Sequence, residues 1–242
     1  REYSFIHYDD LDIPVDEHYV RLNRAAGRWR LNQLPNGNTL ITPLLSLKAL
    51  YIKENDLSIS MESRIALVQQ LAAAVSQLFR KEWLHNDIKP QNVLHVGESS
   101  IRLIDFQLAC AQAEINDLYG DTKRSARLGT DGYQAPEVLS GGASKVSVSS
   151  DIWALGCTVY YILTGKEVFD TKGINTNDEK QNLMVEMREN REKPIITSKQ
   201  MIADGINSNL ARVIERMLIP KMNYRTTELV TILNHLCKIT IT

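Results

Sequence analysis

The chain has 242 residues, which is enough for one large domain or for two smaller lobes. Its hydrophobic fraction of 43% and its charged fraction of 24% are ordinary for a globular protein, and a formal net charge of −1 gives no indication of a surface that binds nucleic acid or a membrane. The three cysteines are odd in number and widely spaced, which favours free thiols over a disulfide framework or a metal site: Cys110, Cys157 and Cys237.

Residues 1–47 are expected to form a small and mostly extended region. Val20–Leu22 and Thr39–Thr42 are candidates for short strands, and residues 34–38 between them contain the Asn-Gly pair that favours a hairpin. The chain is then expected to leave the sheet at Pro43.

The central part of the chain predicts one long helix and two short strands. Apolar residues recur from Met61 to Phe79 at steps of three and four, which indicates an amphipathic helix over about residues 60–82. Residues 93–95 and 101–104 are short strand candidates on either side of a turn that contains glycine.

Further helices are predicted downstream. Residues 149–164 are apolar almost all round, so this helix should be buried, and Gly165 suits its C-terminal end. The longest apolar stretch lies within this helix and is too short to cross a membrane. Three weaker helices are expected at about residues 179–190, 207–218 and 226–238.

The most informative motif lies between the predicted long helix and the two short strands. It reads His85-Asn86-Asp87-Ile88-Lys89-Pro90-Gln91-Asn92, and Asp105-Phe106-Gln107 begins thirteen residues after Asn92. An acid, a lysine and an amide at this spacing, followed by a second acid before Phe, resemble the catalytic loop and the magnesium motif of eukaryotic-type protein kinases. The lysine is typical of the Ser/Thr branch of that family.

The resemblance implies a role for each of these side chains. Asp87 would orient the substrate hydroxyl and accept its proton, and Lys89 would stabilise negative charge at the γ-phosphate of ATP. Asn92 and Asp105 would hold Mg²⁺. Thr130, within a Leu-Gly-Thr-Asp-Gly-Tyr-Gln-Ala-Pro-Glu stretch that resembles the end of a kinase activation segment, would hydrogen-bond Asp87 and Lys89 beneath the substrate.

Other residues match the family's structural supports. Asp151, at the start of the predicted buried helix, would accept backbone N–H bonds from the catalytic loop and hold it rigid. Arg225 falls where the family places the partner of Glu137, and such a pair can be bidentate. His85 is expected to pack against Phe106 and not to act as a base.

The resemblance covers about residues 39–238 and implies an α+β, protein-kinase-like bilobal fold. Residues 1–45 would form a reduced or partial β-rich small lobe with the hinge, and residues 46–242 would form a mainly helical large lobe. At the hinge, the adenine of ATP would use the Pro43 carbonyl and the Leu45 N–H.

The chain departs from the family pattern at three places. No lysine precedes Lys48 and no Gly-rich loop is present, so the lysine that contacts the α- and β-phosphates has no candidate. With Val20–Leu22 as the fourth strand of the small lobe, too few residues precede it for three more strands and a helix, so the lobe is either natively reduced or lacks its front here. Asn86 replaces the arginine before the catalytic aspartate, and Gln107 replaces a glycine and restricts the backbone after Asp-Phe.

Two functions follow from the resemblance, and we favour the first, which is ATP- and Mg²⁺-dependent phosphoryl transfer to Ser or Thr of a protein substrate. The alternative is a pseudokinase that acts as a scaffold or allosteric module for a regulatory protein partner, which the missing lysine and glycine loop favour. The activation-segment stretch argues against a small-molecule or lipid kinase. Free thiols and the lack of a signal-peptide pattern indicate an intracellular location, cytoplasmic or nuclear, or secretion into a host cell as an effector.

Overall fold

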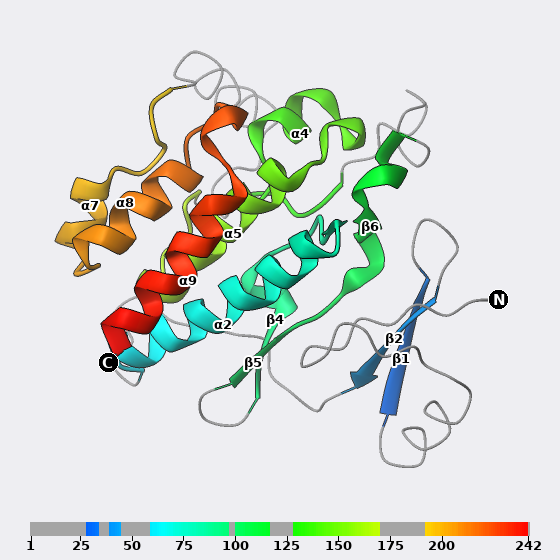
Figure 1. The fold of residues 1–242 in the computed structure, drawn as a ribbon, viewed down its shortest axis with the longest axis horizontal. Coiled ribbons are helices and arrows are strands. Elements are labelled where there is room, and N and C mark those ends of the chain that lie inside the picture. The colour runs from blue at the N-terminus through cyan, green and yellow to red at the C-terminus, as the bar shows by residue number, and fades with distance from the viewer. Residues whose placement is uncertain are drawn as a thin grey trace.

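Three long helices lie side by side and form most of the body of the molecule (Figure 1). They are α2 (Met61–Arg80), α5 (Val148–Thr164) and α9 (Thr227–Ile241). The structure is a computed structural model, and the residues it describes are 28–33, 39–44, 59–96, 100–116, 128–169 and 192–241.

Helix α2 confirms the helix predicted over residues 60–82. Ser60 caps its N-terminus, where the Ser60 hydroxyl accepts a hydrogen bond from the Ser63 N–H at 3.2 Å. Arg64 is buried although it is charged, and its guanidinium donates to the carbonyls of Ile59 at 3.2 Å and of Leu163 at 3.1 Å. Arg64 therefore ties the first turn of α2 to the last turn of α5.

Helix α5 forms the centre of the core. All residues from 150 to 164 are buried, as the continuous apolar pattern predicts. The helix ends at Gly165, whose φ of 74° is left-handed and suits glycine. At Gly156 the helix approaches its neighbour so closely that an added Cβ would lie 2.9 Å from the Cβ of Met217. A glycine inside this helix is thus explained by helix packing.

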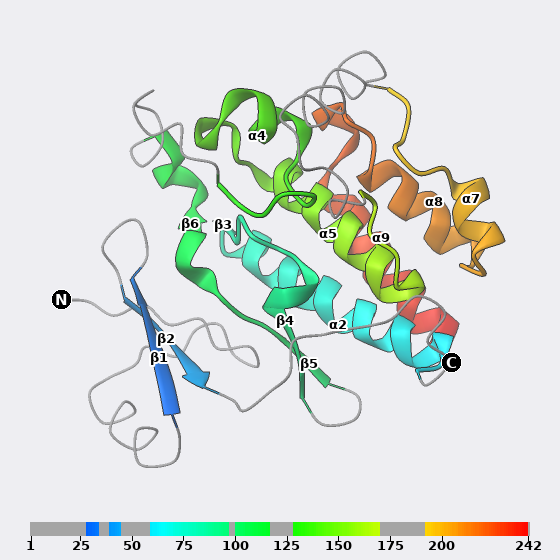
Figure 2. The same ribbon diagram turned by 180° about the vertical axis from the view of Figure 1, so that it is seen from behind.

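The remaining helices surround this core (Figure 2). Helix α8 (Ser208–Met217) and helix α9 confirm two of the three weaker helices, and the one predicted at residues 179–190 lies outside the described residues. The short helices α4 (Pro136–Gly141) and α7 (Ser198–Ala203) are not predicted by periodicity, because six residues are too few to show it. No helix in the described ranges is long and apolar enough to cross a membrane.

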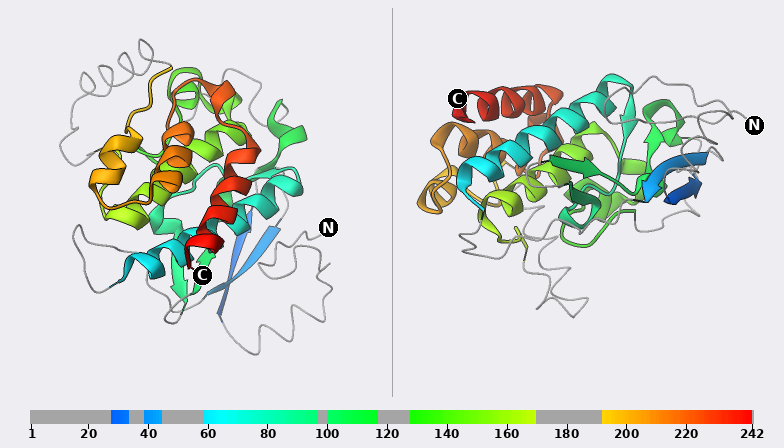
Figure 3. Two further views of the ribbon diagram at one scale, coloured as in Figure 1. Left: turned by 60° about the vertical axis from the view of Figure 1, so that its left-hand side comes forward. Right: turned by 90° about the horizontal axis from the view of Figure 1, so that it is seen from below.

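A β-hairpin lies at the end of the molecule opposite α7 and α8 (Figure 3). Strand β1 (Arg28–Gln33) pairs antiparallel with β2 (Thr39–Leu44), so the hairpin signal in residues 34–38 is confirmed. The expectation that the strand before this turn is Val20–Leu22 is wrong, because the strand that pairs with β2 across the turn is β1; Val20–Leu22 itself lies outside the described residues. The prediction that the chain leaves the sheet at Pro43 is wrong, because β2 continues to Leu44. Among the described residues β2 pairs on one side, with β1, so a proline without an N–H is compatible with this strand.

Two further antiparallel pairs lie against the helical body. Strand β3 (Trp83–Leu84) pairs with β6 (Cys110–Ala111), and β4 (Val93–Val96) pairs with β5 (Ser100–Leu103), which confirms both strands predicted there. The connection from β3 to β4 and the connection from β5 to β6 carry the two acidic motifs. The strand pairing therefore brings these motifs to the same place.

Candidate active site

Asp151 of α5 fixes the backbone of the loop that follows β3. Its two carboxylate oxygens accept the N–H groups of His85 at 2.7 Å and of Asn86 at 2.9 Å. Asp151 is 1% exposed, and burial raises the pKa of its carboxyl to about 7, while the two N–H bonds act to lower it. The contact expected from the sequence is present, and it places the loop on the most deeply buried helix.

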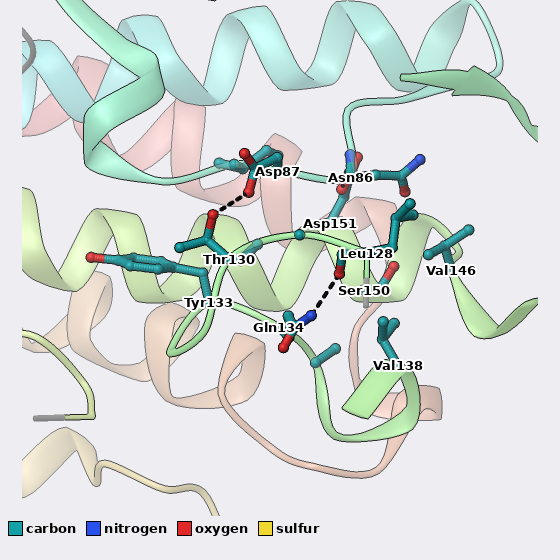
Figure 4. A pocket seen from close by; sticks show the side chains of 14 residues that line it. Asn86, Asp87, Leu128, Thr130, Tyr133, Gln134, Val138, Val146, Ser150 and Asp151 are labelled. Atoms are coloured by element: carbon teal, nitrogen blue, oxygen red, sulfur yellow. Dashed lines mark hydrogen bonds between the residues drawn. The ribbon is translucent and has the colours of Figure 1, made fainter. Parts of the chain in front are cut away.

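Asp87, Lys89 and Thr130 form a closed ring of hydrogen bonds, of which Figure 4 shows the bond between Thr130 and Asp87. The Thr130 hydroxyl donates to Asp87 Oδ1 at 2.7 Å, and Lys89 Nζ donates to Asp87 Oδ2 at 2.7 Å and to Thr130 Oγ1 at 2.6 Å. The side chains of Asp87 and Lys89 are 10% and 17% exposed, so the carboxylate and the ammonium are shielded but still reach solvent. Lys89, which is close to Asp87 in sequence, and Thr130, which is 43 positions away, thereby hold one carboxylate in a single orientation.

Asn92 connects this ring to the second acidic motif. Its Nδ2 donates to Asp87 O at 2.8 Å and to Asp87 Oδ2 at 3.0 Å, and its backbone carbonyl accepts the Ile104 N–H at 2.8 Å. Because Nδ2 is committed to Asp87, the amide oxygen is the atom of Asn92 that remains to bind a cation.

Asp105 directly follows Ile104 and has a left-handed backbone, with φ 65° and ψ 65°. Its Oδ1 atom is buried and has no hydrogen-bond partner in the described structure. A buried carboxylate oxygen without a partner is costly unless a cation or another donor completes it. Carboxylate and amide oxygens are the ligands that Mg²⁺ prefers, so Asp105 and Asn92 fit a magnesium ion.

His85, the first residue of the first motif, is fully buried and contacts the second. Burial lowers its pKa from 6.5 to about 4, although Asp87 and other neighbours act to raise it. The imidazole is therefore neutral near pH 7: Nε2–H donates to the Ile104 carbonyl at 3.0 Å, and Nδ1 accepts the Asp87 N–H at 3.3 Å. Its ring centroid lies 4.7 Å from that of Phe106. Both nitrogens are used inside the protein, which leaves none to act as a base.

The segment before α4 packs tightly on the loop formed by residues 85–92. A Cβ added to Gly129, whose φ is +91°, would lie 3.0 Å from the Asn86 carbonyl oxygen and 3.5 Å from Gln134 Cγ. Gln134 in turn donates from Nε2 to the Leu128 carbonyl at 2.7 Å (Figure 4). Only glycine permits both this φ and this approach, and the position of Thr130 depends on it.

Arg225 and Glu137 form an ion pair that holds the first turn of α4. Arg225 Nη2 donates to both carboxylate oxygens of Glu137 at 2.5 Å, and the rest of the guanidinium donates to three carbonyls: Ser149, Ile219 and Pro220. The Arg225 side chain is fully buried and lies over the Trp153 ring at 5.3 Å. Burial lowers the pKa of Arg225, and Glu137 acts to raise it. The predicted pair is therefore present, with one guanidinium nitrogen shared by both oxygens.

The two hinge residues expected from the sequence are not both placed. Pro43 lies within β2 opposite Trp29, and Leu45 falls outside the described residues. Sequence reasoning assigned no contact to Asn86, Gly129 or Arg64. Two sequence signals could have found two of these residues. Gly129 is a glycine directly before Thr130, and Arg64 is a charged residue on the apolar face of α2.

Comparisons with known proteins identify the family to which this chain is similar. A family model described as "Protein kinase domain" matches residues 38–237. An Aurora kinase from Encephalitozoon cuniculi (strain GB-M1) is 30% identical over 168 residues, which cover 69% of this chain and 54% of that protein. Serine/threonine-protein kinase prpf4B from Dictyostelium discoideum is 29% identical over 156 residues, and the L-type lectin-domain containing receptor kinase V.5 from Arabidopsis thaliana is 31% identical over 147 residues. The chain spans 54%, 18% and 21% of these three relatives.

Proposed function

This chain belongs to the protein kinase domain family, and from that premise we propose that it transfers the γ-phosphoryl group of ATP to a Ser or Thr hydroxyl of a protein substrate. The observation that carries the proposal is the ring formed by Asp87, Lys89 and Thr130. It presents a carboxylate and an ammonium side by side, which are the two groups that the reaction requires at the attacking hydroxyl and at the transferred phosphoryl group.

In the proposed reaction, Asp87 accepts the proton of the substrate hydroxyl as its oxygen bonds to the γ-phosphorus. The bond between that phosphorus and the β–γ bridging oxygen breaks, and ADP leaves. Lys89 stabilises the negative charge on the equatorial oxygens. Thr130 holds both side chains in register, which reduces the reorganisation needed at the moment of transfer.

Protein kinases generally use Mg²⁺ to neutralise the phosphates of ATP. In this chain Asn92 Oδ1 and Asp105 would hold the ion, since Asp105 Oδ1 is buried without a partner and Asn92 Nδ2 is directed to Asp87. The backbone of Asp105 has a left-handed φ of 65°, a conformation that carries an energetic cost.

The test is transfer of labelled phosphate from ATP with Mg²⁺ to a mixture of Ser/Thr peptides, by the wild type and by Asp87→Asn. This substitution keeps the shape of the side chain and an acceptor oxygen but removes the base, so we expect the rate to fall by about 100-fold or more. Asp204→Asn is the matched control, because Asp204 pairs with Lys166 outside this site. Equal rates for wild type and Asp87→Asn would refute the proposal.

A pseudokinase scaffold is the second candidate, favoured by Asn86 and Gln107, which stand where the family pattern has an arginine and a glycine. Titration with ATP, with and without Mg²⁺, separates the two candidates, because a ligand that binds only the folded state raises the melting temperature. No shift at millimolar ATP and no phosphate transfer would together favour the scaffold, whose partner would then be a regulatory protein.

A further inference from the structure

Asn86 contacts three separate parts of the fold. Its N–H donates to Asp151 Oδ1 of α5 at 2.9 Å, and its carbonyl oxygen is the atom against which Gly129 packs. Its side-chain Nδ2 donates to the Leu108 carbonyl at 2.8 Å and to Cys110 Sγ at 3.3 Å. Asn86 is therefore the residue where the catalytic loop meets the chain that follows Asp105.

The orientation of the Asn86 amide is set by these neighbours. Rotation by half a turn would place Oδ1 against the Leu108 carbonyl, so that two oxygens would face each other without a proton between them. The observed orientation leaves Asn86 Oδ1 buried without a partner. A backbone φ of 63° adds to the cost, although asparagine tolerates it better than most residues do. The contacts with Leu108 and Cys110 therefore form although the Asn86 conformation costs free energy.

Strand pairing fixes only a short part of the chain that Asn86 contacts. We call residues 106–111 the 106–111 segment; it consists of η2 (Phe106–Leu108), Ala109 and β6. Strand β6 pairs with β3 over only two residue pairs, and one further bond joins the Gln112 N–H to the Glu82 carbonyl at 2.8 Å. Such a short pair of strands is not stable alone.

We propose that Asn86 is a positioning residue, which fixes the distance between Asp87 and Asp105 by clamping the 106–111 segment to the catalytic loop. Asp87 is the next residue after Asn86, and Asp105 directly precedes the segment. A shift of the segment by about 1 Å would misplace the metal ligand relative to the base, and such a displacement can cost about 100-fold in rate. The effect on catalysis rests on the proposed function, whereas the clamp itself does not.

The clamp is tested directly by the reactivity of Cys110 toward a small maleimide, measured by mass spectrometry on the folded protein. All three cysteines are free and buried, so Cys157 and Cys237 serve as internal controls. Asn86→Asp keeps the size and the tolerance for positive φ but replaces the donor with an oxygen that repels the Leu108 carbonyl. We expect Cys110 to react at least 10-fold faster, with Cys157 and Cys237 unchanged. Asn209→Asp, the same change at an exposed position, should alter none of the three.

Steady-state kinetics of the same variants test the link to catalysis. Asn86→Asp should lower kcat at least 10-fold and leave KM for ATP within about 2-fold of the wild type, because it disturbs the alignment and not the binding of the nucleotide. If Asn86→Asp does not fold, Asn86→Gly removes the same donor and accepts the φ of 63°.

The outcomes separate this proposal from the proposed function. Equal acceleration at all three cysteines means that Asn86 only adds to overall stability, and no acceleration at Cys110 means that there is no clamp; either result overturns the proposal. Faster labelling of Cys110 with unchanged kcat overturns the link to catalysis. If the wild type transfers no phosphate, the proposed function fails, and the labelling of Cys110 still decides whether Asn86 clamps the segment.

Discussion

Acidification should remove the stability that the protein gains by burying a neutral His85. The folded pKa of about 4 lies below the ordinary value of 6.5, so between these pH values the unfolded chain binds a proton that the folded protein does not. The His85 contribution is therefore fully present above about pH 6.5 and is lost as the pH falls toward 4. From about pH 7.5 to about pH 5, the loss in the free energy of unfolding is about 2 kcal/mol.

Asp151 opposes this effect over part of the same range. Its folded pKa of about 7 lies above the ordinary value of 3.8, so its contribution to stability is present at low pH and is lost as the pH rises through 7. Between about pH 7.5 and pH 5 the two groups change the stability by similar amounts and with opposite sign. The pH dependence of the wild type alone therefore does not isolate His85.

A variant without the imidazole isolates the histidine. His85→Leu has a similar volume and cannot titrate, so we expect the difference in unfolding free energy between wild type and variant to shrink by about 2 kcal/mol between about pH 7.5 and pH 5. Urea unfolding at both pH values, followed by circular dichroism, measures this difference. A difference that stays constant within about 0.5 kcal/mol would show that His85 titrates normally in the fold and that the argument from burial is wrong.

Three further substitutions test single contacts. Glu137→Gln leaves the Arg225 cation buried without its counter-ion and should lower the free energy of unfolding by about 3 kcal/mol in urea titrations; a loss below about 1 kcal/mol would contradict it. Gly156→Ala should also destabilise, by about 1–3 kcal/mol in the same assay, since the clash with the Met217 Cβ outweighs the better helix propensity of alanine. Thr130→Val removes the hydroxyl at constant shape and should lower kcat by about 10-fold or more in the phosphate-transfer assay, while Thr130→Ser should retain most of it.

The helical body follows from the sequence because its signals are local. Periodicity over residues 61–79 locates α2, and the mostly apolar stretch before Gly165 locates α5 and its end. The order and spacing of Asp87 and Asp105 identify the family, since the chemistry of phosphoryl transfer requires these residue types together.

The parts that could not be predicted depend on contacts between distant segments. The length of β2 beyond Pro43 depends on its pairing with β1, which a proline alone does not reveal. Nothing in the sequence around Asn86 shows that its amide is directed to Leu108, because that contact forms only when β3 and β6 pair. One sequence shows which residue types suit the chemistry more readily than it shows which neighbouring residues position them.

The attachment of the loop after β3 to Asp151 also bears on how this part of the protein exchanges its amide hydrogens. Loops usually exchange their amide hydrogens through small local openings, well before the core does. Here the amides of His85 and Asn86 are bonded to a carboxylate on α5, whose residues 150–164 are all buried. Their exchange with deuterated solvent requires the loop to separate from this carboxylate, so we expect it to be slower than exchange from a loop that is held only by its own turns.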